Sequence, residues 1–187
     1  MKEERLIVDE MNKYNFTPAS RDETLIFGAS RPGYPETSAI SDSVVNEWMN
    51  FMESNGIKAV CCLLAEEQLG FYQSNLLTSY RKRFGSENVN SAPIPDYTLA
   101  DETLLVTMIL PFLAASAGRS EKVVVHCSAG SGRTGHVLAA WLVYGRGLTN
   151  QEALVAVCSS GGQRNPSEAP GKSTLNALLD ACRREAE

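Results

Sequence analysis

Short apolar runs alternate along this chain with longer stretches in which apolar residues recur every three or four positions. The first pattern is typical of buried strands and the second of amphipathic helices. The runs predict strands at residues 24–27, 57–64, 88–94 and 122–125. The helical spacing predicts helices at 41–54, 66–84, 101–117, from Thr134 onward, from Asn150 to about Val157, and at 173–184. This order predicts an α/β fold with a central, mainly parallel twisted sheet of about four to five strands and helices on both faces.

Several residues mark where these helices begin, end or bend. Asn55-Gly56 and Gly85 are expected to end two of the helices, and either Gly145 or Gly147 a third. Thr149 and Glu152 have the spacing of a capping box. Pro111 should kink the helix at 101–117, because proline has no backbone donor and clashes with the preceding turn.

The stretch E-K-V-V-V-H-C-S-A-G-S-G-R-T-G at 121–135 joins a predicted strand to a predicted helix through a glycine-rich loop. Unpaired N–H groups at a helix N-terminus, together with the helix dipole, favour an anion at this place. The amides from Ser128 to Arg133 can therefore converge on one tetrahedral oxyanion, and the planar fork of Arg133 can hold two of its oxygens. A cysteine in such a field is expected to be a thiolate at neutral pH, which makes Cys127 a candidate nucleophile.

The composition fits one globular domain. The chain has 187 residues, of which 43% are hydrophobic and 21% charged. We expect a single domain over 1–187, with 1–23 as an N-terminal extension that packs on it. The formal net charge of -5 and the absence of Lys/Arg runs argue against a nucleic-acid partner.

The cysteines and the hydropathy indicate a reducing compartment. The chain has five cysteines, an odd number without CxxC spacing. It shows no charged-then-apolar leader and no apolar run near the ~20 residues that a membrane helix needs. We therefore expect a cytoplasmic monomer that does not bind membranes. Four of the cysteines are expected to be small core residues: Cys61, Cys62, Cys158 and Cys182.

Two motifs carry a resemblance to a known family. The string H-C-S-A-G-S-G-R-T-G at 126–135 resembles the His-Cys-x5-Arg-Ser/Thr signature of the cysteine-dependent protein tyrosine phosphatases. The string P-I-P-D-Y-T at 93–98, about 30 residues earlier, resembles the mobile acid loop of their compact dual-specificity branch. The likeness covers roughly residues 24–185. It implies a phosphatase that uses neither a metal nor another cofactor and acts on phosphorylated proteins.

The resemblance implies a role for each motif residue. Cys127 would attack phosphorus and form a phosphocysteine that water then hydrolyses. Asp96 would protonate the leaving oxygen and later act as the base. Thr134 would donate its hydroxyl to the cysteine sulfur, and His126 would orient the loop from outside the substrate site. The phosphate would be bound by Arg133 and by the loop amides of Ser128, Ala129, Gly130, Ser131 and Gly132.

Related enzymes often position the hydrolytic water with a polar side chain after the fourth helix. Gln163, Arg164, Asn165 and Glu168 all compete for this role, and the prediction favours Gln163. The loop side chains Ser128, Ala129 and Ser131 are uncharged, whereas relatives that act on inositol phosphates often carry lysine there. Phosphotyrosine is therefore the preferred substrate, with phosphoserine/threonine beside it and a phosphoinositide as the alternative.

Other readings of these residues stay open. The same anion loop could serve a phosphopeptide-binding module without turnover, although Cys127 and Asp96 argue against it. A sulfurtransferase or an arsenate reductase would also use a cysteine-centred anion loop, but neither gives Asp96 a role. Arg31 and Tyr34, in the loop G-A-S-R-P-G-Y-P at 28–35, could face the site or simply decorate a surface turn.

Overall fold

A computed structural model describes residues 13–169 and 171–186. Within this part of the chain, one five-stranded sheet has the order β1-β2-β5-β3-β4. β1 is antiparallel to β2, and the other neighbours are parallel. The strands are β1 (Thr17–Pro18), β2 (Ile26–Ser30), β3 (Ile57–Cys62), β4 (Val89–Ser91) and β5 (Lys122–Cys127). The predicted fold class, a mainly parallel sheet of four to five strands, is confirmed.

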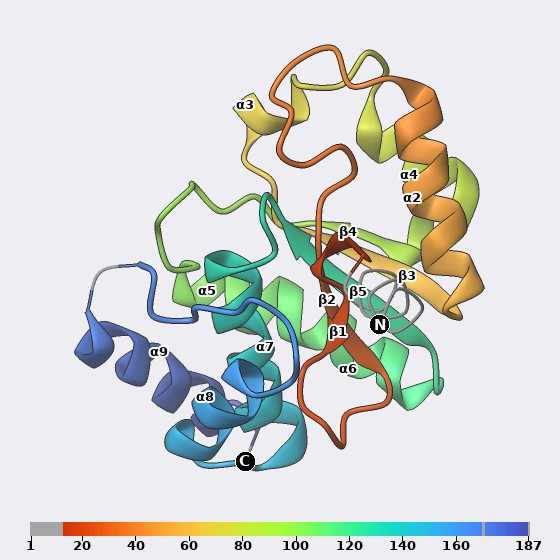
Figure 1. Ribbon diagram of the computed structural model, residues 1–187. Coiled ribbons are helices and arrows are strands. Elements are labelled where there is room, and N and C mark those ends of the chain that lie inside the picture. Colours follow the sequence, from red (N-terminus) through yellow and green to blue (C-terminus); the bar gives the residue numbers. More distant parts are fainter. Residues whose placement is uncertain (1–12, 170, 187) are drawn as a thin grey trace, which may run out of the picture.

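Helices cover both faces of the sheet (Figure 1). One face is covered by α2 (Asp42–Ser54) and α4 (Leu76–Phe84), which pack on β3 and β4. The other face is covered by five helical segments: α5 (Glu102–Leu104), α6 (Leu110–Gly118), α7 (Gly132–Arg146), α8 (Asn150–Cys158) and α9 (Lys172–Arg184). Short helical turns complete the chain: η1 (Lys13–Asn15), α3 (Glu66–Leu69), η2 (Ser86–Asn88) and the π-helical η3 (Leu105–Ile109).

The alternation of side chains along the strands divides the core in two. Val124 of β5 packs with the buried Trp48 and Tyr80 on the α2–α4 side. Its neighbours Val123 and Val125 pack with the residues of α6 and α7 on the opposite side. β5 lies at the centre of the sheet and is buried on both faces. This position requires apolar side chains on both sides of the strand, which explains its almost continuous apolar sequence.

The prediction of one continuous helix at 66–84 is wrong, because the structure has two separate helices there, α3 and α4. α3 ends at Gly70, and Tyr72 then forms an isolated bridge with Ile40. A new helix begins after Asn75, whose side chain accepts a hydrogen bond from Thr78 N at 2.8 Å. The apolar spacing continues across the break, so the pattern alone concealed it.

Helical structure is present over the predicted 101–117 range, but it is divided into α5, the π-helical η3 and α6, and the predicted kink at Pro111 stays a prediction. The side chain of Asp101 caps its start by accepting from Leu104 N at 3.2 Å. A π-helical stretch precedes α6, in which Pro111 lies in the first turn. Proline is tolerated there because its missing N–H removes no helical hydrogen bond in a first turn.

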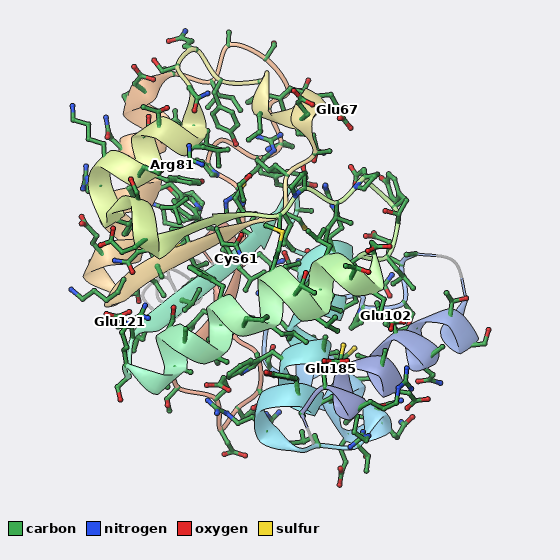
Figure 2. All side chains as sticks on the ribbon, turned by 180° about the vertical axis from the view of Figure 1, so that it is seen from behind. Cys61, Glu67, Arg81, Glu102, Glu121 and Glu185 are labelled. Atoms are coloured by element: carbon green, nitrogen blue, oxygen red, sulfur yellow. The ribbon has the colours of Figure 1, made fainter. Side chains whose placement is uncertain are left out.

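Three of the four cysteines predicted as core residues are buried: Cys61, Cys62 and Cys182. Figure 2 shows Cys61 between the sheet and the helical layer of residues 102–118. Burial raises the pKa of Cys62 and of Cys182 to about 12, so both stay thiols. Cys158 lies exposed at the end of α8, and the prediction that it belongs to the core is wrong. Among the described helices, none is long and apolar enough to cross a membrane.

Candidate active site

The loops that follow four parallel strands meet at the carboxyl edge of the sheet. Tyr34 follows β2, Gln68 follows β3, Asp96 follows β4, and Cys127 ends β5. Ligand sites of open α/β sheets lie at this edge. A cavity of about 100 Å³, called here the phosphate cavity, is lined by residues from three of these loops and from the 159–171 loop. Its lining residues are Tyr34, Asp96, Tyr97, Cys127, Ser128, Ala129, Ser131, Gly132, Arg133 and Glu168.

Cys127 lies at the bottom of the phosphate cavity, at the end of the central strand, and only 3% of its surface is exposed. The loop turns back to α7 through Gly130, whose φ of +73° favours glycine. A Cβ atom at Gly130 would lie 2.5 Å from the backbone of Ala29, so a side chain there would displace the loop. α7 begins at Gly132, two residues earlier than predicted, which places the loop directly at its N-terminus.

Arg133 is buried and held in place by neutral groups. Its Nη1 donates to Gln68 Oε1 at 2.8 Å and to the carbonyl of Ile94 at 2.9 Å. Its Nη2 lies 3.0 Å from Asp96 Oδ1, but is not aligned for a hydrogen bond to any described residue. Nη1 is therefore fixed by two hydrogen bonds, while Nη2 faces the carboxylate of Asp96.

Asp96 lies over this arginine, although 42% of its side chain is exposed. Its Oδ2 accepts from Gln68 Nε2 at 3.2 Å, and its Oδ1 accepts from Tyr97 N at 3.1 Å. The hydroxyl of Thr98 donates to the carbonyl of Pro95 at 2.8 Å and closes the turn. The 93–98 loop therefore places the carboxylate of Asp96 beside Arg133.

Gln68 connects these two functional groups, since its amide contacts both Arg133 and Asp96. The same Oε1 also accepts from Ala65 N at 3.3 Å, which fixes the side chain. Sequence reasoning missed Gln68. Its position 28 residues before Asp96 gives no motif, and only the parallel pairing of β3 with β4 and β5 brings it to the site.

The two histidines of the chain are both buried beside the loop. His126 Nδ1 lies 3.3 Å from the carbonyl of Cys127, and its Nε2 lies 3.2 Å from Tyr80 Oη. A carbonyl can only accept, so Nδ1 carries the proton and Tyr80 donates. His136 Nε2 accepts from Ala100 N at 3.0 Å and so joins α7 to the segment after the acid loop. Burial lowers the pKa of each imidazole to about 4.

Thr134 is fully buried in the first turn of α7. Its Oγ1 has no hydrogen-bond partner among the described residues, so the expected bond to the sulfur of Cys127 is not made in this structure. The role of Thr134 stays a prediction.

Arg31 is not a surface residue, which corrects one of the two predicted readings. It is 1% exposed, and its Nε donates to Ser128 Oγ at 3.2 Å. The Arg31 backbone N–H also donates to the carbonyl of Ser128 at 3.0 Å. Arg31 therefore supports the outer side of the loop, while Tyr34 is half exposed at the rim of the phosphate cavity.

The structure separates the four candidates for positioning water. Glu168 lines the phosphate cavity, and its carboxylate lies so close to Gly132 that a Cβ there would be 2.0 Å from Oε2. The buried Arg164 instead donates to the carbonyl of Gly130 and, at 2.8 Å, to that of Asn15. Neither Gln163 nor Asn165 lines this cavity. Position therefore favours Glu168 over Gln163 for this role, which itself stays a prediction.

Gln163 lines a neighbouring hollow of about 320 Å³, called here the side cavity. It shares Tyr34, Ala129 and Ser131 with the phosphate cavity. Its other lining residues are Tyr14, Asn15 and Ser30. Within the described residues, no group of three or more His, Cys, Asp or Glu side chains could hold a metal ion.

A family model matches the central part of the chain. A family model described as "Polymorphic toxin system, DSP-PTPase phosphatase" matches residues 31–147, which include Asp96, Cys127 and Arg133. A comparison with curated proteins finds no match.

Solved structures of phosphatases share the fold. Kinase associated phosphatase, with its catalytic cysteine replaced by serine, is 20% identical with a TM-score of 0.70, covering 91% of this chain and 93% of that one. PTPMT1 in complex with PI(5)P is 15% identical with a TM-score of 0.67, and the match covers 92% of this chain and 99% of PTPMT1. TpbA of P. aeruginosa, in complex with pTyr, is 17% identical with a TM-score of 0.58, and the match covers 93% of this chain and 91% of TpbA. At such identities these structures show the fold alone.

Proposed function

This chain belongs to the DSP-PTPase phosphatase family of polymorphic toxin systems, and we propose that it hydrolyses phosphotyrosine in proteins, with phosphoserine and phosphothreonine as poorer substrates. The observation that carries the proposal is the convergence of Cys127, Arg133 and Asp96 on one small cavity with an aromatic rim. Tyr34 and Tyr97, 50% and 69% exposed, stand at this rim. A phosphorylated phenol ring would pass between them while its phosphate enters the cavity.

The first chemical step is assigned to Cys127. Its sulfur attacks phosphorus, the S–P bond forms, and the bond to the leaving oxygen breaks. The spread charge on the equatorial oxygens is stabilised by the loop amides and by the guanidinium of Arg133. Since Gln68 and Ile94 already hold its Nη1, little reorganisation is needed during the reaction.

Asp96 is assigned to proton transfer. It lies beside the arginine that would hold the phosphate, so it can give its proton to the leaving oxygen. In the second step a water molecule attacks phosphorus while Asp96 accepts its proton; the new P–O bond forms, the S–P bond breaks, and phosphate leaves the Cys127 thiolate. Glu168, at the opposite wall near Gly132, is assigned to orient this water.

A protein substrate is favoured over a phosphoinositide by the charge of the cavity. Among the described residues that line it, Arg133 is the only basic one, and the loop side chains Ser128, Ala129 and Ser131 are neutral. Additional phosphates on an inositol ring would find no cation there. PTPMT1 is solved with PI(5)P and TpbA with pTyr, so the shared fold does not decide between the two substrate classes, and the charge of the cavity supports the choice.

The test is hydrolysis by the purified chain in EDTA and reductant, with a phosphotyrosine peptide, a phosphothreonine peptide and a soluble phosphoinositide as substrates. We expect the phosphotyrosine peptide to have the highest kcat/KM. Cys127→Ser should abolish turnover, and Asp96→Asn should reduce kcat by about 10²- to 10⁴-fold. Cys158→Ser, at an exposed cysteine away from the cavity, is the matched control and should leave the rates unchanged. Faster hydrolysis of the phosphoinositide, or turnover by Cys127→Ser, would refute the proposal.

A further inference from the structure

We propose that the side cavity is a specificity subsite that binds an uncharged side chain next to the phosphotyrosine of the substrate, with Gln163 as its selecting residue. This inference rests on the proposed function. The side cavity adjoins the phosphate cavity because Tyr34, Ala129 and Ser131 line both. A peptide whose phosphotyrosine enters the phosphate cavity would therefore carry a neighbouring side chain past this shared wall.

The chemistry of the side cavity favours a neutral occupant. None of the described residues that line it is charged. A charged side chain that entered would lose water without gaining a counter-ion, which costs free energy. The rings of Tyr14 and Tyr34 offer apolar surface to a planar or aromatic group.

Three polar groups in the side cavity are free to bind such an occupant. The hydroxyls of Ser30 and Ser131 and the side-chain amide of Gln163 form no hydrogen bond with another described residue. Only the backbone of Gln163 is engaged, since its N–H donates to Asn15 Oδ1 at 2.8 Å and its carbonyl accepts from Asn15 Nδ2 at 3.3 Å. The Gln163 amide can both donate and accept, so it suits an amide or hydroxyl side chain.

The wall beside Gln163 is formed by a strained segment that is bonded to its backbone. Tyr14 and Asn15 have φ angles of 61° and 50°, which non-glycine residues rarely adopt. Asn15 is kept in this conformation by its side chain, which donates to the carbonyls of Ala129 at 3.1 Å and Gly130 at 3.3 Å. Strain of this kind persists where surrounding contacts enforce it, often at ligand sites. The side cavity is thus tied directly to the phosphate-binding loop.

Tyr14, Asn15 and Gln163 lie outside residues 31–147, the segment that the family model matches. The cavity therefore depends on how the segments before and after this common part fold against the loop.

The experiment compares kcat/KM for p-nitrophenyl phosphate, which reaches only the phosphate cavity, with phosphotyrosine peptides whose flanking residue is Gln, Tyr, Ala, Glu or Lys. We expect the wild-type chain to prefer Gln and Tyr. Gln163→Ala should lower kcat/KM for the Gln peptide by about tenfold, the effect of one lost hydrogen bond. Gln163→Glu should shift the preference toward the Lys peptide, while p-nitrophenyl phosphate changes less than about twofold.

Gln151→Glu, the same charge change on the exposed face of α8, is the matched control and should alter no preference. Urea unfolding of each variant checks that the fold is retained. If wild type cleaves phosphotyrosine peptides without a flanking preference, or if Gln163→Glu changes all substrates equally, the subsite is refuted and the proposed function stands. If wild type cleaves p-nitrophenyl phosphate but no phosphotyrosine peptide, both proposals fail.

Discussion

Mild acid should destabilise this protein through its two histidines. His126 and His136 are the only histidines in the chain, and both are buried beside the phosphate-binding loop. Burial lowers the pKa of each from 6.5 to about 4. Between these values the unfolded chain binds protons that the folded chain cannot bind. The stability contributed by the neutral imidazoles is therefore complete above pH 6.5 and is lost as the pH falls toward 4.

The size of the effect follows from the two pKa values. At pH 5.5 each histidine is about 90% protonated in the unfolded chain and almost unprotonated in the folded chain. The two sites together give a slope of roughly 2.4 kcal/mol per pH unit there. Integrated from pH 7 to pH 5, the loss is about 3–4 kcal/mol, a large share of the roughly 5–15 kcal/mol that stabilises a typical domain.

The assay is urea unfolding followed by tryptophan fluorescence at half-unit steps from pH 7 to pH 5. Replacement of one histidine should remove about half of the slope, whatever it does to stability at pH 7. His136→Gln is suitable because its amide oxygen can still accept from Ala100 N. Carboxylates contribute little above pH 5, since they titrate near pH 4.

A loss below about 1 kcal/mol between pH 7 and pH 5 would refute the reasoning. So would a slope that His136→Gln leaves unchanged. Either result would mean that water or a counter-ion reaches the imidazoles in the folded state.

Three further variants test the site itself. Gln68→Leu removes the amide that contacts both Arg133 and Asp96. Steady-state kinetics should show kcat/KM reduced by about ten- to a hundredfold, because a hydrogen bond to a charged group contributes roughly 1.5–3 kcal/mol. An unchanged kcat/KM would mean that Gln68 is dispensable. Glu168→Gln should slow hydrolysis of the phosphocysteine by roughly tenfold or more, so mass spectrometry of a quenched reaction should detect phosphorylated Cys127. Gln163→Ala is the control and should not accumulate this intermediate. Equal accumulation in both variants would contradict the assignment of Glu168. Gly130→Ala places a methyl group on a residue of left-handed conformation, against the backbone of Ala29. Urea unfolding should show the free energy of unfolding lowered by at least about 1–2 kcal/mol, and activity should be lost. A free energy of unfolding equal to that of wild type would argue against the loop geometry.

Most of the fold could be predicted from the sequence, because it follows from local patterns. The strand and the helix around Cys127 were predicted to within two residues, since β5 is apolar on both faces and the loop carries its own glycines. The break between α3 and α4 was missed, because the bridge between Tyr72 and Ile40 joins segments that are far apart in the chain. Apolar spacing records which side chains are buried, but not whether the helix between them is continuous.

The residues of the candidate site also fall into two groups: those that short motifs predict and those that only the tertiary structure brings to the site. The sequence by itself was enough to propose Cys127 as the nucleophile together with its loop and Arg133, since these residues lie within one strand-loop-helix unit, and a second short motif singled out Asp96. Only the tertiary structure placed Gln68 between Arg133 and Asp96, buried Arg31 behind the loop, and put Glu168 rather than Gln163 in the phosphate cavity. The physical reason is that parallel strands bring the ends of distant segments to one edge of the sheet, and contacts made there leave no periodic or local trace in the sequence.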